Sequence, residues 1–285
     1  TTTWIEDTRP AWDLPEACIK YFQEREVIPS KLGIAGLKEW MPVREYHALM
    51  GGIVPSEVID MEHLLRDMRM VKSMKERDQM RRASRVVARG FDFISNTTFP
   101  ILDERTLEAI IDREMRLEGV EDVRVLFGRP NEKQWALRPA GDLQVSEGDS
   151  IIIYMALSFE RYWAEGMRTF SFKHGAFMKP DLAPLTALFE KGLSGMVPGK
   201  TVSQLYEGLV GGVKKDDLGP ILVYGLGHGI GLSPLEFPIL DDKSPIMMKE
   251  GMCLALRLSA RSEGLGVVMT GDTFLLTPSG PERLT

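Results

Sequence analysis

The hydrophobic period changes in the middle of the sequence, and this change constrains the fold more than any other feature. Three runs there are rich in β-branched and aromatic side chains and are separated by turn-forming residues: 123–128 (VRVLFG), 148–159 (GDSIIIYMALSF) and 161–172 (RYWAEGMRTFSF). Such runs are typical of β-strands. They predict one strand followed by a two-stranded hairpin.

Helical patterns stand on both sides of these strands. Apolar residues recur at helical spacing over about residues 75–94 and again over 104–118. Further helices are predicted over residues 181–196 and from Thr201, where Thr201 and Gln204 can form a capping box. The last third returns to strand-like runs: 221–225 (ILVYG), 250–258 (EGMCLALRL) and 266–277 (GVVMTGDTFLLT). Strands gathered between helical blocks indicate an α+β fold rather than an alternating parallel sheet.

The N-terminal quarter of the chain has a separate pattern. It predicts a helix over residues 10–27 and a short strand over 31–36; residues 45–73 then predict a helix, a Gly-Gly-x-x-Pro break and a second short helix. A domain boundary is therefore predicted between residues 1–69 and 70–285. Because the sequence begins as if in the middle of a domain, we expect an upstream part.

Composition excludes several classes of function. The formal net charge is -6 and the basic residues are scattered, which argues against a nucleic-acid partner. The two cysteines, Cys18 and Cys253, have neither the spacing of a disulfide framework nor that of a zinc site, so a reducing cytoplasm is expected. No apolar run approaches the roughly 20 residues that span a bilayer, so no membrane partner is expected.

A glycine-rich stretch, GLGHGIGL at residues 225–232, surrounds His228. Glycine allows tight turns and a close approach of the backbone to another group, so this histidine is predicted to face a pocket. The simpler alternative is a turn that happens to contain a satisfied histidine.

Six motifs occur in a fixed order: MRMVKSMKERDQMRRAS, EGDSIIIYM, YWAEGMRTF, GLGHGIGL, KEGMCLAL and GDTFLLTPSGPERLT. This series resembles the creatinase/aminopeptidase (M24 peptidase-like) family, whose pita-bread fold is shared by methionine aminopeptidase, prolidase, aminopeptidase P and creatinase. The resemblance covers roughly residues 70–285. Residues 1–69 resemble the end of a creatinase-type N-terminal domain. The resemblance implies a pita-bread fold and, as in creatinase-type relatives, a homodimer.

The family's peptidases hold two divalent metal ions with two aspartates, one histidine and two glutamates. The resemblance places these ligands at Tyr154, Glu165, His228, Arg257 and Gly271. Only His228 is identical, and a guanidinium at Arg257 would repel a cation from the space that it must occupy. The family's auxiliary histidines correspond to Ala136 and Leu235. The resemblance therefore implies a prolidase- or creatinase-type member whose metal site is lost, with no cofactor.

Creatinase is the family's example of catalysis without metal. The positions that match its acid–base residues are Ala136, Met167 and Arg257 in this sequence. Hydrolysis of creatine is therefore not predicted.

The same positions predict a pocket with chemistry of its own. The predicted catalytic residues are His228, Glu165 and Tyr154; the predicted substrate-binding residues are Arg257, Glu236 and Arg168. Arg257 supplies a fixed positive charge for a substrate carboxylate or an oxyanion, while His228 or Glu165 would move protons. The structural alternatives are a buried Arg257–Glu165 ion pair that fills the metal hollow, a solvated turn position for Glu236, and an acidic neighbour for Arg168.

Three functions are open at this point. The first is a metal-independent, creatinase-like hydrolase or lyase that acts on a small carboxylate-bearing or amino-acid-derived molecule, most simply at a C–N bond. The second is a pseudo-peptidase that binds a peptide or a protein without catalysis. The third is a divergent Xaa-Pro metallopeptidase with shifted ligands: Glu165, His228, Glu236 and Asp272. Strand alternation argues against the third, because Asp272 is one residue from the required position and so should face the other side of its sheet.

Overall fold

The computed structural model describes residues 8–38, 40–99, 102–130, 136–211 and 225–285. It divides into two compact units, Thr1–Met68 and Arg69–Thr285. No helix of the described residues is long and apolar enough to cross a bilayer.

The first unit is built from two helices and a two-stranded parallel sheet. The helices are α1 (Leu14–Glu24), which Asp13 caps by accepting from the backbone of Glu16, and α2 (Val43–Ile53), and they pack together. Strand β1 (Lys31–Ile34) pairs with β2 (Glu57–Asp60).

Strand β2 was not predicted by the sequence pattern, which put only a break and a helix in this region. Its four residues are too few for the alternation of side chains to stand out, and they become a strand only by pairing with β1, more than 20 residues earlier. The helix that follows, α3 (Glu62–Met70), leads into the second unit.

The second unit contains the predicted central strands and the helices before them. Helix α4 (Met74–Asn96) begins at a capping box made by Ser73 and Glu76, and α5 (Glu104–Leu117) is capped by Asp103. The central strands are β4 (Asp122–Gly128), β6 (Ser150–Phe159) and β7 (Tyr162–Lys173), and β6 and β7 form the predicted hairpin. Short strands accompany them: β3 (Leu102–Asp103), which pairs with β5 (Gln144–Val145), and β8 (Ala176–Met178), which pairs with β7.

The rest of this unit follows the predicted order of helices and strands. Helices α6 (Ala183–Leu193) and α7 (Val202–Val210) come first, and the capping box of Thr201 and Gln204 is present at the start of α7. The strands are β9 (Gly227–Gly229), β10 (Glu236–Ile239), β11 (Cys253–Ser262), β12 (Gly266–Thr277) and β13 (Gly280–Arg283). Most of the strand predicted at 221–225 lies outside the described residues, since the description resumes at residue 225.

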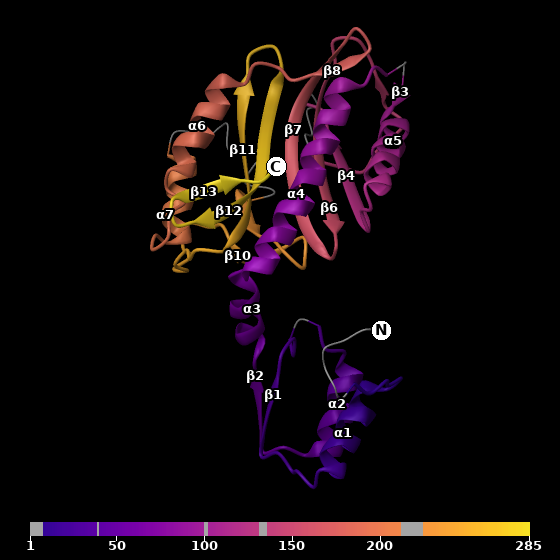
Figure 1. Ribbon diagram of the computed structural model, residues 1–285, viewed down its shortest axis with the longest axis vertical. Coiled ribbons are helices and arrows are strands. Elements are labelled where there is room, and N and C mark those ends of the chain that lie inside the picture. Colours follow the sequence, from indigo (N-terminus) through magenta and orange to yellow (C-terminus); the bar gives the residue numbers. More distant parts are fainter. Residues whose placement is uncertain (1–7, 39, 100–101, 131–135, 212–224) are drawn as a thin grey trace. The chain divides into compact units, whose positions relative to one another are not determined.

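One sheet of nine strands organises the second unit, in the order β10-β9-β11-β12-β7-β6-β4, with β13 beside β12 and β8 beside β7. Helices α4 and α5 cover the part made by β4, β6 and β7, whereas α6 and α7 lie against the β11 and β12 part (Figure 1).

Alternation along β6 decides which side chains face the helices. Ile151, Ile153 and Leu157 are fully buried in the cluster under α4 and α5. Because side chains of a strand alternate between the two faces, Tyr154 points to the opposite face. That face carries the pocket.

Candidate functional site

A pocket with a volume of about 590 Å³ opens in the second unit, and its polar lining includes Tyr154, Glu165, His228 and Arg257. This volume is in the range of small-molecule sites. Four of the six predicted site residues therefore come together in one cavity.

Strand register explains how residues so far apart in sequence meet. On the hairpin, Tyr154 lies opposite Met167 and Ala156 lies opposite Glu165, so Tyr154 and Glu165 are diagonal neighbours on one face. On the other side, His228 of β9 lies opposite Ala255 of β11, which makes Arg257 its diagonal neighbour. Strand β12 runs between the two pairs.

Gly271 of β12 lies opposite both Arg257 and Met167. Directly opposed residues share a face of the sheet, so a side chain at this position would stand between Arg257 and the hairpin. A Cβ atom there would come within 3.0 Å of the Cβ atom of Arg257. The missing side chain thus leaves the guanidinium room to reach across β12 to Glu165.

Arg257 is the centre of the polar contacts in this pocket. Its Nη2 atom lies 2.6 Å from Nε2 of His228 and 3.1 Å from Oε1 of Glu165. The hydroxyl of Tyr154 donates to Oε2 of Glu165 at 2.7 Å. The side chains of Arg257, His228 and Glu165 are all less than a tenth exposed. The predicted Arg257–Glu165 ion pair is therefore present.

The contacts of His228 indicate its tautomer. Its Nδ1 atom lies 2.9 Å from the carbonyl oxygen of Gly229, which can only accept, so Nδ1 carries the hydrogen and donates. The guanidinium of Arg257 has only donors, so Nε2 of His228 accepts from it. His228 thereby holds Arg257 in place and has no free acid–base nitrogen in this arrangement.

Tyr154 stays a hydrogen-bond donor at ordinary pH. Burial, followed by the negative charge of Glu165, raises the pKa of its hydroxyl well above the usual value. The neutral phenol orients the carboxylate of Glu165 by a hydrogen bond and adds no second negative charge beside it.

One donor in the pocket has no protein partner. The Nε atom of Arg257 is buried and makes no hydrogen bond to any described residue. Buried donors are almost always satisfied, so this enclosed atom is one of a few exceptions among the described residues. Arg257 also lines the pocket, where its positive charge attracts a ligand carboxylate.

These residues do not fit the pair of metal ions that the resemblance attributes to the family's peptidases. Glu165 and His228 occupy two of the ligand positions that the resemblance gives, and Nη2 of Arg257 lies 3.1 Å from Oε1 of Glu165 and 2.6 Å from Nε2 of His228. Within the part of the chain that the structure describes, no three His, Cys, Asp or Glu side chains gather as a metal site would require. A permanent cation already takes the position between the two ligands.

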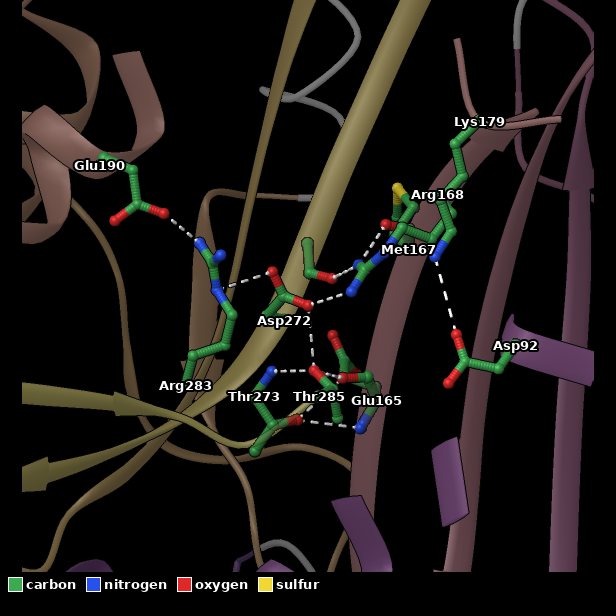
Figure 2. Close-up of polar contacts among 11 residues, drawn as sticks. Asp92, Glu165, Met167, Arg168, Lys179, Glu190, Asp272, Thr273, Arg283 and Thr285 are labelled. Atoms are coloured by element: carbon green, nitrogen blue, oxygen red, sulfur yellow. Dashed lines mark hydrogen bonds and ion pairs between the residues drawn. The ribbon is translucent and has the colours of Figure 1, made fainter. Parts of the chain in front are cut away.

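Glu165 is anchored from behind by residues that the sequence analysis did not single out. Oγ1 of Thr273 accepts from the backbone N of Glu165 at 3.0 Å and donates to its carbonyl oxygen at 2.8 Å (Figure 2). Oγ1 of Thr285 in turn accepts from the backbone N of Thr273 at 2.9 Å. The only sequence signal was their place in the motif GDTFLLTPSGPERLT, because the contacts cross from β12 to β7.

Arg168 was predicted to bind substrate, but the structure gives it another place. It is not among the residues that line the pocket; Nη2 lies 2.6 Å from Oδ1 of Asp272, and Nη1 donates to the carbonyl oxygen of Gly271 (Figure 2). Its guanidinium also lies over the ring of Phe91 in α4, on the helix-covered face. We therefore no longer assign Arg168 to substrate binding.

Asp272, the fourth ligand of the shifted metal site, is likewise outside the pocket lining. It lies between Arg168 and Arg283 (Figure 2). Burial raises the pKa of its carboxyl, against the opposing charges of these two arginines. The predicted set of shifted metal ligands is not brought together.

Glu236 is also held away from the pocket lining. Its Oε2 atom lies 2.9 Å from Nζ of Lys72, and its Oε1 atom accepts from Arg69 and from the backbone N of Ser233. The side chains of Glu236 and Lys72 are 5% and 2% exposed. Glu236 therefore neither lines the pocket as predicted nor lies in solvent, because the buried Lys72 fixes its carboxylate.

Replacing Lys72 with Met is expected to lower the free energy of unfolding by about 2 kcal/mol at pH 7, which is less than the roughly 3–5 kcal/mol of a fully broken buried pair because Arg69 still contacts Glu236. Burial alone would raise the pKa of Glu236, but Lys72 and Arg69 outweigh it and hold the pKa below its usual value. A carboxyl group whose pKa is lower in the folded state stabilises the folded protein at pH values above its unfolded pKa of about 4.3. This stabilisation is lost as the pH falls through the folded pKa.

Urea unfolding at pH 7 and at pH 3.5 tests this expectation. The deficit of Lys72→Met should shrink at the lower pH. Lys75→Met on the exposed side of α4 is the control and should change the free energy by less than about 0.5 kcal/mol. An equal deficit at both pH values would contradict the charge-based explanation.

The remaining lining of the pocket is largely apolar, and the sequence pointed to only one of its residues, Leu235, through the resemblance. It includes Val125, Leu126, Leu137, Pro139 and Leu235. Arg124 also contributes, with its guanidinium 5.1 Å from the centre of the Trp163 ring. The site thus combines a few charged side chains, Arg257 and Glu165 at its centre, with an apolar wall, a common arrangement for ligand recognition.

Comparisons with known proteins agree with this architecture. The family model described as metallopeptidase family M24 matches residues 78–278. The chain is 22% identical to the Xaa-Pro dipeptidase of Pyrococcus furiosus over 95% of this chain and 79% of that protein. It is 23% identical to the Xaa-Pro dipeptidase of Pyrococcus horikoshii over 79% of this chain and 65% of that protein.

A solved structure shows the same fold. The Xaa-Pro dipeptidase from Bacillus anthracis superposes with a TM-score of 0.78 at 21% identity, covering 95% of this chain and 76% of that chain. The predicted α+β pita-bread fold is confirmed.

Proposed function

The chain belongs to metallopeptidase family M24, and from this membership and the geometry of the pocket we propose that it is a hydrolase of short peptides or related amino-acid-derived amides. The guanidinium of Arg257, a permanent positive charge on a residue that lines the pocket, carries the proposal. It marks where the carboxylate of a substrate binds, in the hollow where the resemblance places the family's metal ions.

Arginine suits this role because its charge is permanent and its donors match a carboxylate. Its position is fixed before the ligand arrives, since Nη2 donates a hydrogen bond to His228 and forms an ion pair with Glu165. Little ordering of the side chain then opposes binding. His228 acts here as a positioning residue.

Glu165 is the group best placed to move a proton. It accepts a proton from water as the water oxygen attacks the carbonyl carbon of the substrate, and it returns that proton to the leaving nitrogen as the C–N bond breaks. The oxygen of the water thus ends in the new carboxylate, and the proton that Glu165 carried ends on the new amine. Tyr154 and Thr273 hold the side chain and the backbone of Glu165 during the reaction.

We also propose that this chemistry proceeds without a metal ion at the pocket. The support is the donor set, in which a guanidinium lies between the two potential ligands Glu165 and His228. A second candidate is metal-dependent hydrolysis of Xaa-Pro dipeptides. It is favoured by the names of the relatives, two of which are Xaa-Pro dipeptidases.

Amine release from a panel of Xaa-Pro dipeptides, other dipeptides and N-acyl amino acids separates these candidates. We expect turnover that EDTA does not inhibit and that added Mn²⁺ does not increase, with less than stoichiometric metal in the purified protein. Loss of turnover in EDTA and its recovery with Mn²⁺ would overturn the metal-free proposal in favour of the second candidate. Binding without turnover of any panel member would overturn the assignment as a hydrolase and indicate a binding protein.

A further inference from the structure

The pocket does not stop at the face of the sheet. It wraps around the edge of strand β4. Arg124 and Leu126 of β4 lie opposite Ala156 and Tyr154 of β6, and so share the face of the polar site. Val123 and Val125 alternate to the helix-covered face, yet they line the same cavity. A cavity lined by both sets of side chains includes the strand edge between them.

Among the described residues, most of that edge of β4 is unpaired. β4 is the last strand in the sheet order, with β6 on one side only. On the other side, Phe127 exchanges two backbone hydrogen bonds with Arg138, at 2.8 and 2.9 Å. This single bridge shows that the edge can pair with extended backbone.

The bridge also fixes which backbone groups face outward. In an antiparallel strand, the N–H and C=O groups of alternate residues point to the same side. Since those of Phe127 point away from β6, and the register with β6 is unbroken, those of Val125 and Val123 do so too. No described residue pairs with them on that side.

The groove along this edge continues beyond the site. A second cavity, of about 260 Å³, shares Glu108, Val123 and Val125 with the first and extends along α5 to Asp112. Glu108 has no ion-pair partner among the described residues, and burial, followed by the charge of Asp112, raises the pKa of its carboxyl. An extended ligand would therefore find one cationic anchor, a strand edge and a carboxylate in sequence.

We propose that the ligand of this site is a peptide of at least four residues that binds as an added strand on the edge of β4 that the described residues leave free, with its carboxylate at Arg257. This inference rests on the proposed function and narrows its substrate class. Outward-facing Val123 and Val125 lie about 7 Å apart along the strand, so pairing with both requires peptide residues two positions apart. Main-chain hydrogen bonds of this kind provide affinity with little dependence on sequence.

N-methylation of a probe peptide tests the pairing directly. Tetra-alanine has three amide N–H groups, and only alternate ones can face β4. We expect methylation of one set, either the amide of residue 3 or those of residues 2 and 4, to weaken calorimetric binding at least 10-fold, while methylation of the other set changes it less than 3-fold. Equal effects at all positions would overturn the pairing.

A variant of the strand gives the complementary test. Val123→Pro removes one outward N–H but no hydrogen bond to β6, and proline is tolerated at such edge positions. We expect about 10-fold weaker binding of tetra-alanine, whereas the control Val123→Ala, which keeps the N–H, stays within 3-fold. Unchanged binding by a folded Val123→Pro protein would overturn the proposal; if that protein does not fold, the methylation series decides alone.

The outcome also separates this inference from the proposed function. Binding of tetra-alanine that requires Arg257 but shows no alternation would leave the carboxylate anchor and overturn only the strand pairing. Absence of binding, or binding unaffected by Arg257→Ala, would overturn both.

Discussion

Arg257→Ala is expected to abolish amine release and to weaken binding of carboxylate-bearing peptides by 10- to 100-fold. Arg257 lines the pocket, and a charge-assisted hydrogen bond from its guanidinium is worth about 1.5–3 kcal/mol. Isothermal titration with tetra-alanine and a discontinuous amine assay measure the two effects. If the guanidinium only fills a hollow, neither binding nor turnover will change.

The same substitution is expected to lower the free energy of unfolding by about 3 kcal/mol, because it leaves the carboxylate of Glu165 buried without its cation. The control is the double variant Glu165→Gln with Arg257→Ala. Removing both charges should recover most of the lost stability, since the cost comes from the stranded charge. Activity should not return in the double variant. A double variant as unstable as the single one would show that packing, not charge, dominates.

Glu104→Ala is expected to have the largest effect on stability, about 3–5 kcal/mol. The Glu104 side chain is fully buried and accepts from Nε of Arg129 at 2.8 Å and from Nη1 of Arg138 at 2.6 Å. It also accepts from the backbone N of Gly141 at 3.1 Å. Its loss would leave two arginines facing each other beside the start of α5.

This cluster also supports the pocket. Leu137 and Pro139, which flank Arg138, line the cavity, so release of Arg138 should loosen that wall and weaken binding of tetra-alanine. Chemical denaturation and calorimetry on the same sample check both effects. Arg113→Ala on the exposed side of α5 is the control, because its side chain is 74% exposed, it lines neither cavity, and its surface ion pair with Glu114 contributes little.

The pH dependence of this effect has a definite sign. Burial alone would raise the pKa of the Glu104 carboxyl, but the hydrogen bonds from Arg138 and Arg129 have the larger effect and hold this pKa below its usual value. Its contribution is therefore present above pH 4.3, the approximate unfolded pKa, and disappears as the pH falls through the folded value. The difference between wild type and Glu104→Ala should shrink in that acid range. A difference that is constant down to pH 3 would mean that the carboxylate charge is not its source.

Much of the fold could be predicted from local patterns. The β6–β7 hairpin, α4, α5 and the capping box at Thr201 each depend on residues close together in sequence. Strand β2 could not, because its pairing with β1 joins distant segments. The same reason explains why Thr273 and Thr285 were missed: their value lies in contacts with Glu165, more than 100 residues away.

The site residues could also be predicted only where they depend on local sequence. The match to the family's motifs placed Tyr154, Glu165, His228 and Arg257 in one predicted pocket, because each motif is a short local stretch of sequence. Only the tertiary structure showed that Arg168 and Glu236 lie outside the pocket lining, since their partners, Asp272 and Lys72, come from remote segments of the chain. It also decided that β4 has a free edge, because which strands end a sheet is settled by the pairing of the whole chain, and no single segment encodes it.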